Sequence, residues 1–119
     1  MFHSIPMKHH SVYVIKLDKK VLRRKKFREA NPNYNPLKPC VYVGMTGLDP
    51  EQRFQNHMSG HKASKWAQSF GERLLPKLYE HLNPMTSAEA EEKEIELRRK
   101  LRNQGFGVWP ADSSEFEES

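Results

Sequence analysis

The pattern of apolar and polar positions predicts two strands in the first half of the chain. From position 11 to 17, Tyr13 and every second residue after it fall on one face, a period that is typical of a strand. Residues 40–43 form a short run of β-branched and aromatic side chains, which indicates a buried strand. We expect Gly44 to end this strand and residues 45–48 to form a turn.

Helix-starting signals follow at three places. Asp49 is followed by a proline and, three residues after the cap, by a glutamine, which predicts a helix from position 50. Ser64 caps a shorter predicted helix that Gly71 stops. Thr86, with a glutamate three residues later, predicts a long helix that ends at Gly105 after about five turns.

The remaining segments complete the predicted fold class. Residues 73–82 are β-like, although Pro76 places them at a sheet edge or a bulge. Residues 106–109 are expected to form a last short strand or a packed extension. Together these elements predict an α/β (α+β) fold, in which a small central mixed or antiparallel three-stranded sheet is flanked by helices.

A length of 119 residues fits one domain with a single core. We expect residues 1–10 to be a loose lead-in and residues 11–110 to be the domain. Residues 111–119 are expected to be a disordered acidic tail.

Residues 18–39 form a basic insertion between the first two strands that is far longer than a hairpin turn. Its second half contains three prolines and is not expected to be helical. It is either an arm that follows nucleic-acid phosphates, with Phe27 and Tyr34 stacking on bases, or a solvated basic loop. The cations expected to contact nucleic acid are Arg23, Arg24, Lys25 and Lys26.

Charge favours a polyanionic partner. The net charge is +5, and four of the 15 acidic side chains lie in residues 112–119, so the rest of the chain is more basic than the total indicates. Nucleic acid is the first candidate partner, and solubility alone is the other interpretation. The single Cys40 excludes an intrachain disulfide and a cysteine-based zinc site. With no apolar run near ~20 residues and no signal-peptide pattern, we expect a cytoplasmic protein.

Glu94 is the one acidic residue on the apolar stripe of the long helix. At 100° per residue it falls in line with Ala90, Leu97 and Leu101. A carboxylate in this position must be paired, protonated or bound to a metal, because burying it bare is costly. An ion pair with an arginine and a metal site are therefore both open.

A second set of chemical groups surrounds the second strand. Arg53 and His57 are four residues apart on the helix that follows it, so they share a face. Tyr42 on the strand and the bare backbone at Gly44 precede them. This combination indicates a site that handles phosphate, whereas each residue alone is also explained as strand core or solvated helix face.

These motifs, in this order, resemble the GIY-YIG endonuclease family over about residues 11–109. The first strand lacks the family's usual leading glycine, the gap between the tyrosine motifs is longer than usual, and the asparagine that often follows the glutamate helix has no clear counterpart, with Trp109 near its place. The matching residues are Val12-Tyr13-Val14, Val41-Tyr42-Val43-Gly44, Arg53 and His57, and Ala90, Glu94 and Leu97.

The resemblance implies a small stand-alone GIY-YIG domain that hydrolyses DNA phosphodiester bonds. Glu94 would hold one divalent cation, Mg²⁺ or Mn²⁺, and Arg53 would bind phosphate oxygens. Tyr13, helped by Tyr42 or His57, would orient or deprotonate the attacking water, and the general base stays undecided. Gly44, His61, Lys62 and Ser64 are expected to face the DNA backbone. The alternative is a non-catalytic nucleic-acid-binding module on the same fold, and a protein partner is a further possible source of specificity.

Overall fold

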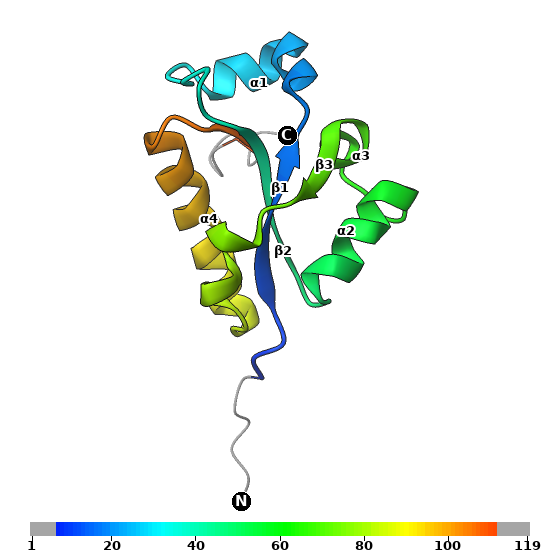
Figure 1. Ribbon diagram of the computed structural model, residues 1–119. Helices are drawn as coiled ribbons and strands as arrows, with labels where there is room; N and C mark the ends of the chain where they lie inside the picture. Colours follow the sequence, from blue (N-terminus) through cyan, green and yellow to red (C-terminus); the bar gives the residue numbers. More distant parts are fainter. Residues whose placement is uncertain (1–6, 112–119) are drawn as a thin grey trace, which may run out of the picture.

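A four-stranded sheet with the order β3-β1-β2-β4 forms the centre of the computed structural model, which describes residues 7–111 (Figure 1). Strand β1 pairs antiparallel with β2 and with β3, whereas β4 runs parallel to β2. The predicted α+β class with a mixed sheet flanked by helices is confirmed, and the sheet has one strand more than predicted. The strands are β1 (Ser11–Leu17), β2 (Cys40–Thr46), β3 (Gly71–Leu74) and β4 (Gly107–Trp109).

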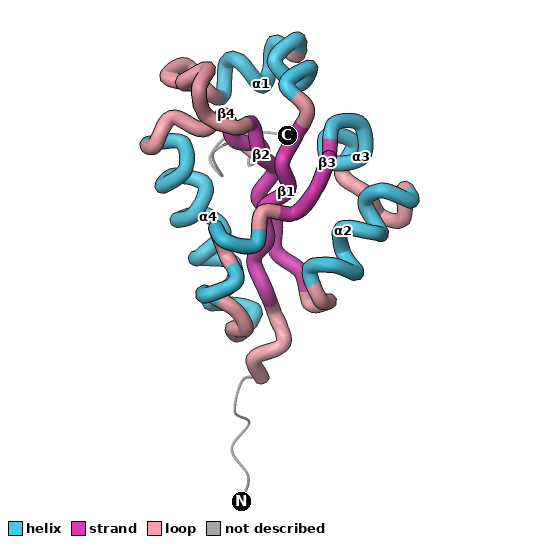
Figure 2. The backbone as a smooth tube through the Cα atoms, in the orientation of Figure 1, coloured by secondary structure: helices cyan, strands magenta, loops and turns pink. Residues whose placement is uncertain are grey.

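Helices flank the sheet on both sides (Figure 2). Helix α4 contacts β1, β2 and β4, whereas α2 and α3 lie on the other side of the sheet against β1 and β3. The 3₁₀ turn η1 and helix α1 stand at the end of the sheet where β1 finishes (Figure 1). The helical elements are η1 (Lys19–Arg23), α1 (Lys25–Ala30), α2 (Pro50–Ser59), α3 (Lys65–Phe70), η2 (Pro76–Leu78), η3 (Glu80–Leu82) and α4 (Ser87–Asn103).

Local chemistry accounts for where the helices begin. The Thr86 side chain accepts a hydrogen bond from the Glu89 N–H, and the Glu89 carboxylate accepts one from the Thr86 N–H, so the predicted capping box at α4 is formed. Ser64 caps α3 as predicted. Asp49 occupies the cap position of α2, but its side chain makes no cap hydrogen bond, so the reciprocal pair expected there is absent.

Two strand predictions were wrong in extent. Strand β2 continues through Gly44 to Thr46, because β1 offers paired partners over the whole of that length. Of the β-like residues 73–82, only the first two lie in β3, and most of the others form η2 and η3. Pro76 starts η2 and has no N–H for a ladder, which is why β3 stops before it.

Backbone contacts hold His10 and Pro110, near the two limits of the described residues. The backbone of His10 exchanges two hydrogen bonds with that of Met85, of 2.9 and 2.8 Å, so residue 10 is not loose. Ala111 is buried, and the Pro110 carbonyl accepts a hydrogen bond from Arg102. The predictions for residues 1–6 and for the acidic segment 112–119 lie outside the described part of the chain.

The basic insertion is folded onto the sheet. Phe27 is completely buried beneath it, so the prediction that Phe27 stacks on bases was wrong. Asn31 fixes the insertion to β4: its side-chain oxygen accepts from the Val108 N–H at 2.8 Å, and its nitrogen donates to the Val108 carbonyl at 3.1 Å. Arg23, Arg24, Lys25 and Lys26 remain exposed, as expected for a surface that meets a polyanion. Within residues 7–111, no helix combines the length and the apolar character needed to cross a membrane.

Candidate active site

Tyr13 and Gly44 are paired across β1 and β2, and the missing side chain of the glycine leaves room for the phenol. A Cβ atom at Gly44 would lie 2.5 Å from the Tyr13 hydroxyl oxygen, closer than such atoms approach. Gly44 is buried, so it shapes the floor of the site and does not face a substrate backbone as expected. Burial raises the pKa of Tyr13 above its usual value, the neighbouring Tyr42 raises it further, and Arg53 opposes the shift.

His57 lies beneath both tyrosines and is fully buried. Its Nε2 is 2.9 Å from the Tyr13 oxygen, and its Nδ1 accepts the Ser64 backbone N–H at 3.1 Å. Burial lowers the pKa of His57 to about 4, and the charge of Arg53 lowers it too, so the ring is neutral at pH 7. Because an N–H can only donate, Nδ1 carries no proton, and the ring must donate from Nε2 to Tyr13.

Tyr42 is the more open of the two phenols. Its ring centroid lies 6.3 Å from that of Tyr13 and 5.6 Å from that of His57. It is half-buried, whereas Tyr13 is only 1% exposed. Burial raises the pKa of Tyr42, the Ser64 side chain opposes this rise, and the charge of Glu94 adds to it.

Arg53 is held on the half-open side of the site by the loop after α2. Its Nη2 donates to the Lys62 carbonyl oxygen at 3.0 Å. Lys62 has a positive φ of 50°, an uncommon conformation for a residue with a side chain. The loop therefore orients the guanidinium through backbone atoms, while the side chains of His61 and Lys62 stay exposed.

Glu94 forms an ion pair with Arg98, one turn further along α4. The glutamate side chain is 20% exposed and the arginine side chain 5%. Burial raises the pKa of Glu94 and Arg98 opposes the shift, while the Nε of Arg98 is buried with no hydrogen-bond partner among residues 7–111. One of the states left open by the sequence, a pair with an arginine, is thus present in the structure. Nothing in the sequence pattern singled out Arg98.

The donor set at Glu94 matches a hard cation that keeps most of its water. Within the described residues no three His, Cys, Asp or Glu side chains cluster as metal ligands, so a closed zinc-type cage is not formed by them. A single carboxylate with substrate phosphate and water is a common way to hold Mg²⁺. The remaining carboxylate oxygen and partial exposure of Glu94 fit this arrangement.

The structure brings the predicted core set together from four elements: Tyr13 from β1, Tyr42 from β2, Arg53 and His57 from α2, and Glu94 from α4. The charge of Glu94 is felt at both Tyr13 and Tyr42, as is that of Arg53. Trp109 pairs with Tyr42 across β2 and β4, and its ring lies 4.4 Å from that of Trp66. The Trp66–Trp109 pair therefore lies next to Tyr42, and Trp109 lies near the place where the family resemblance predicts an asparagine.

Searches with models of known families, against curated proteins and against solved structures found no match to this chain. Its function is therefore argued from the residues themselves.

Proposed function

We propose that this chain is a metal-dependent endonuclease that hydrolyses DNA phosphodiester bonds, a small nuclease of the GIY-YIG type. The observation that carries the proposal is the position of Glu94. Its partly buried carboxylate is paired with Arg98, and its charge contributes to the raised pKa of both Tyr13 and Tyr42, from which the sequence separates it widely. The ion pair with Arg98 offsets the cost of burying this carboxylate and leaves one of its oxygens for a cation.

Arg53 is assigned to the phosphate. Its guanidinium is planar and permanently charged, which suits two non-bridging oxygens of one phosphodiester. The carbonyl of Lys62 holds one edge of it. Arg53 also interacts with the Tyr13 hydroxyl, so the position of the guanidinium is set before a phosphate arrives.

The structure favours a tyrosine over His57 as the group that meets the attacking water. His57 donates from Nε2 and accepts at Nδ1, so it has no free lone pair, and it is fully buried. Tyr42 is the more accessible of the two phenols. We assign it to the water, with Tyr13 and His57 fixing its surroundings. The phenolate form of Tyr42, favoured by a divalent cation nearby, would take the water proton. The water oxygen would bond to phosphorus as one bridging P–O bond breaks, and the leaving oxygen would take a proton from solvent.

A divalent cation bound at Glu94 would supply Lewis-acid stabilisation of the charge that develops on the phosphate and the leaving oxygen. Glu94 would bind the cation through the carboxylate oxygen that does not contact Arg98. Arg98 remains beside the site as a second positive charge. A cytoplasmic location also belongs to this proposal, and it rests on the single, buried Cys40.

The test is nicking of supercoiled plasmid with Mg²⁺ or Mn²⁺ by wild type, Glu94→Gln and Arg53→Ala, each purified identically. Loss of nicking in both variants supports the assignment. Glu91→Gln is the matched control, because Glu91 is an exposed carboxylate on the same helix. Equal nicking by all four proteins means a contaminating nuclease and refutes the site.

Metal binding is tested separately from activity. Mn²⁺ broadens nearby NMR resonances, so we expect loss of the Leu97 and Ala90 amide signals in wild type and their retention in Glu94→Gln. Broadening at the same amides in both proteins would remove Glu94 from the metal site.

A non-catalytic DNA-binding module is the second candidate, favoured by the exposed cations of η1 and α1. Salt-sensitive binding without cleavage under any metal would identify it. Each phosphate contact contributes about 0.9 to the slope of log K against log salt for duplex DNA. Neutralising Arg23, Arg24, Lys25 and Lys26 together would then reduce that slope.

A further inference from the structure

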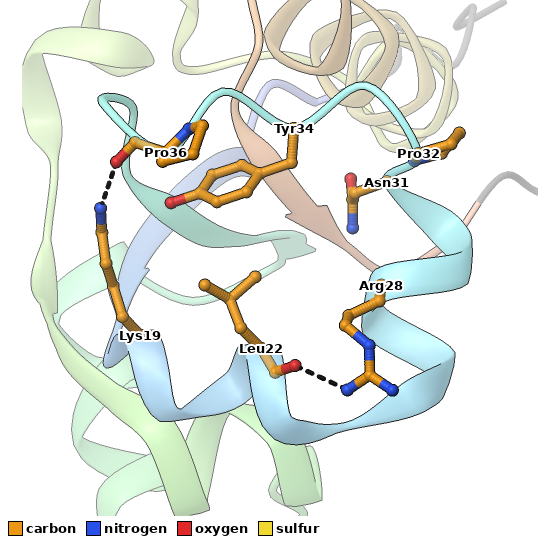
Figure 3. Close-up of a pocket in the computed structure, with 7 residues that line it drawn as sticks. All are labelled: Lys19, Leu22, Arg28, Asn31, Pro32, Tyr34 and Pro36. Carbon is orange, nitrogen blue, oxygen red and sulfur yellow. Dashed lines mark hydrogen bonds between the residues drawn. The ribbon is translucent and has the colours of Figure 1, made fainter.

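A cavity of about 450 Å³ opens in the basic insertion (Figure 3), and none of the residues that line it belongs to the proposed active site. Its volume is within the ~300–1,000 Å³ of small-molecule sites. Leu22 and Tyr34 face one another across it, and Pro32 and Pro36 belong to the segment that carries Tyr34. The walls are mainly apolar and come from residues that follow one another closely along the chain.

The Tyr34 ring is fixed before any ligand arrives. Its hydroxyl donates to the Lys38 carbonyl oxygen at 2.8 Å, which closes the loop that holds the ring. The two prolines restrict the backbone on either side. A rigid aromatic ring at the wall of an open cavity is a stacking platform that needs little ordering on binding.

Two cations stand on either side of that platform. The ammonium of Lys19 lies 5.9 Å from the Tyr34 ring centroid and donates to the Pro36 carbonyl at 2.6 Å. The guanidinium of Arg28 donates to the Leu22 carbonyl at 2.9 Å (Figure 3). Both side chains are held by backbone oxygens, and within residues 7–111 neither makes a salt bridge with a carboxylate. Backbone carbonyls therefore fix the positions of the two positive charges, and no carboxylate of the described residues neutralises them.

We propose that this cavity binds one unpaired nucleotide of a DNA strand, with its base between Tyr34 and Leu22 and its two flanking phosphates on Lys19 and Arg28. An aromatic wall with cations on both sides complements a base whose sugar carries a phosphate on each side. A base within a duplex is stacked and paired, so only an unpaired one can enter. The exposed Arg23, Arg24, Lys25 and Lys26 on the same elements extend the positive surface along which the strand would continue.

This inference rests on the proposed function, since it names a substrate feature for the same nuclease: DNA with a single-stranded segment. It also explains why a long insertion is folded firmly onto the sheet by Asn31 rather than left as a free arm. A fixed insertion holds the unpaired nucleotide at a constant position relative to the catalytic residues.

The test measures binding without divalent metal, in EDTA, by fluorescence anisotropy of a labelled single strand and of the same strand in a blunt duplex. We expect wild type to prefer the single strand, and Tyr34→Leu to bind that strand about tenfold more weakly while its affinity for duplex is unchanged. Tyr34→Phe keeps the ring and is expected to stay within about twofold of wild type. Circular dichroism melting of each variant confirms that it is folded.

The cations have their own signature. Lys19→Gln and Arg28→Gln are each expected to reduce the salt slope for single strands by about 0.7, the value for one phosphate contact. Lys8→Gln is the matched control, because Lys8 is an exposed cation that does not line the cavity. It precedes β1, whereas the cavity begins with η1 after β1. An excess of deoxythymidine monophosphate is expected to compete poorly with the strand, because it offers one phosphate instead of two. Full competition would mean that the cavity binds a free nucleotide, and it would overturn the assignment to a DNA strand.

A strand carrying one 5-iododeoxyuridine is expected to crosslink at Tyr34 on irradiation, as mapped by mass spectrometry. Equal single-strand affinity of wild type and Tyr34→Leu, with crosslinks elsewhere, overturns the inference. The two proposals fail separately. Selective binding with no cleavage under any metal refutes the nuclease alone. Cleavage by wild type and Tyr34→Leu alike, with no preference for single strands, refutes the pocket alone.

Discussion

The hydroxyl oxygen of Tyr13 on β1 lies 2.9 Å from Nε2 of His57 on α2, a bond between residues 44 positions apart. Because Ser64 donates to the other ring nitrogen, the histidine is locked as the Nε2–H tautomer. Its proton therefore points at the tyrosine oxygen. A long-range ¹H–¹⁵N spectrum at pH 7 is expected to show this tautomer for His57, and the Nδ1–H form would contradict it.

The buried His57 makes stability depend on pH. Its pKa is about 4 in the folded chain and near 6.5 when unfolded, so the unfolded state binds more protons between these values. The unfolding free energy therefore falls as pH falls through this window, by about 2 kcal/mol between pH 7.5 and pH 5. Urea titrations at both pH values measure this. His57→Gln is expected to remove most of this dependence of the unfolding free energy on pH, whereas His61→Gln, at an exposed position, should leave it unchanged. If His57→Gln keeps the wild-type pH dependence, His57 is not its source.

Removing Arg98 is expected to destabilise the chain by about 3 kcal/mol at pH 7.5, because the Glu94 carboxylate would be left half-buried without its partner. Arg98→Met tests this by urea unfolding. The pKa of Glu94 is already raised by burial and would rise further, so the unfolding free energy of the variant falls as pH rises through this raised pKa. The loss should therefore be smaller at pH 4. Combining Arg98→Met with Glu94→Leu should recover part of the loss, and purely additive effects would count against a coupled pair.

Gly44→Ala is expected to displace Tyr13, since the added methyl group would lie 2.5 Å from the phenol oxygen. We expect a loss of about 2 kcal/mol in unfolding free energy, as for overpacked cores, and loss of the Tyr13–His57 hydrogen bond. The control is Gly47→Ala, whose methyl group would approach the His10 ring no closer than 3.3 Å. If both variants melt like wild type, Gly44 does not make room for Tyr13.

Asn31→Ala is expected to cost about 3 kcal/mol, because the buried Val108 N–H loses its acceptor, the Phe27 carbonyl loses the Asn31 amide, and Arg102 Nε loses its bond to Asn31. The Val108 carbonyl keeps its bond from Arg102. Asn33→Ala, two residues away and exposed, should change stability by no more than about 0.5 kcal/mol. Urea unfolding of the two variants gives the comparison. Similar stabilities would mean that the insertion is held by its apolar contacts alone.

Arg53→Lys is expected to lower the plasmid-nicking rate about 100-fold, although it keeps the positive charge. The reason is geometric: a lysine cannot hold the Lys62 carbonyl and two phosphate oxygens with one planar group. Arg73→Lys, at an exposed position of β3, is the control. Wild-type nicking by Arg53→Lys would remove the guanidinium from the proposed mechanism.

Local signals predicted most of the fold. The alternation at residues 11–17 and the Thr86 capping box gave β1 and α4 with the correct starts, because strand period and capping chemistry act over a few neighbours. The extent of β2 depended on its partner: Gly44 looks like a strand end until β1 lies beside it. The strand predicted for residues 73–82 was wrong in extent for another reason: the spacing of apolar residues does not distinguish a strand from successive 3₁₀ turns.

The part of the candidate site that the sequence predicted is the one where a charged residue interrupts a regular apolar pattern. Glu94 stands out as a carboxylate on an apolar stripe. The spacing of four residues allows its contact with Arg98, but it did not select this arginine as the partner. The role of Ser64 was not predictable, because its contact with His57 uses a backbone N–H that every residue except proline has. Phe27 and Tyr34 had equal claims to a stacking role in the sequence, and only tertiary packing separates the buried ring from the half-open one.

Tyr13 and Tyr42 belong to the two interior strands of the sheet, each bordered by a hydrogen-bonded neighbour on both edges. Amide groups in such strands exchange with solvent only when the whole domain opens, so their protection should report global unfolding. The phenols thus lie on strands that have hydrogen-bonded neighbours on both edges over part of their length. Motion that admits DNA and releases the cleaved products is therefore expected in the loops and helices around β1 and β2, and not in these two strands.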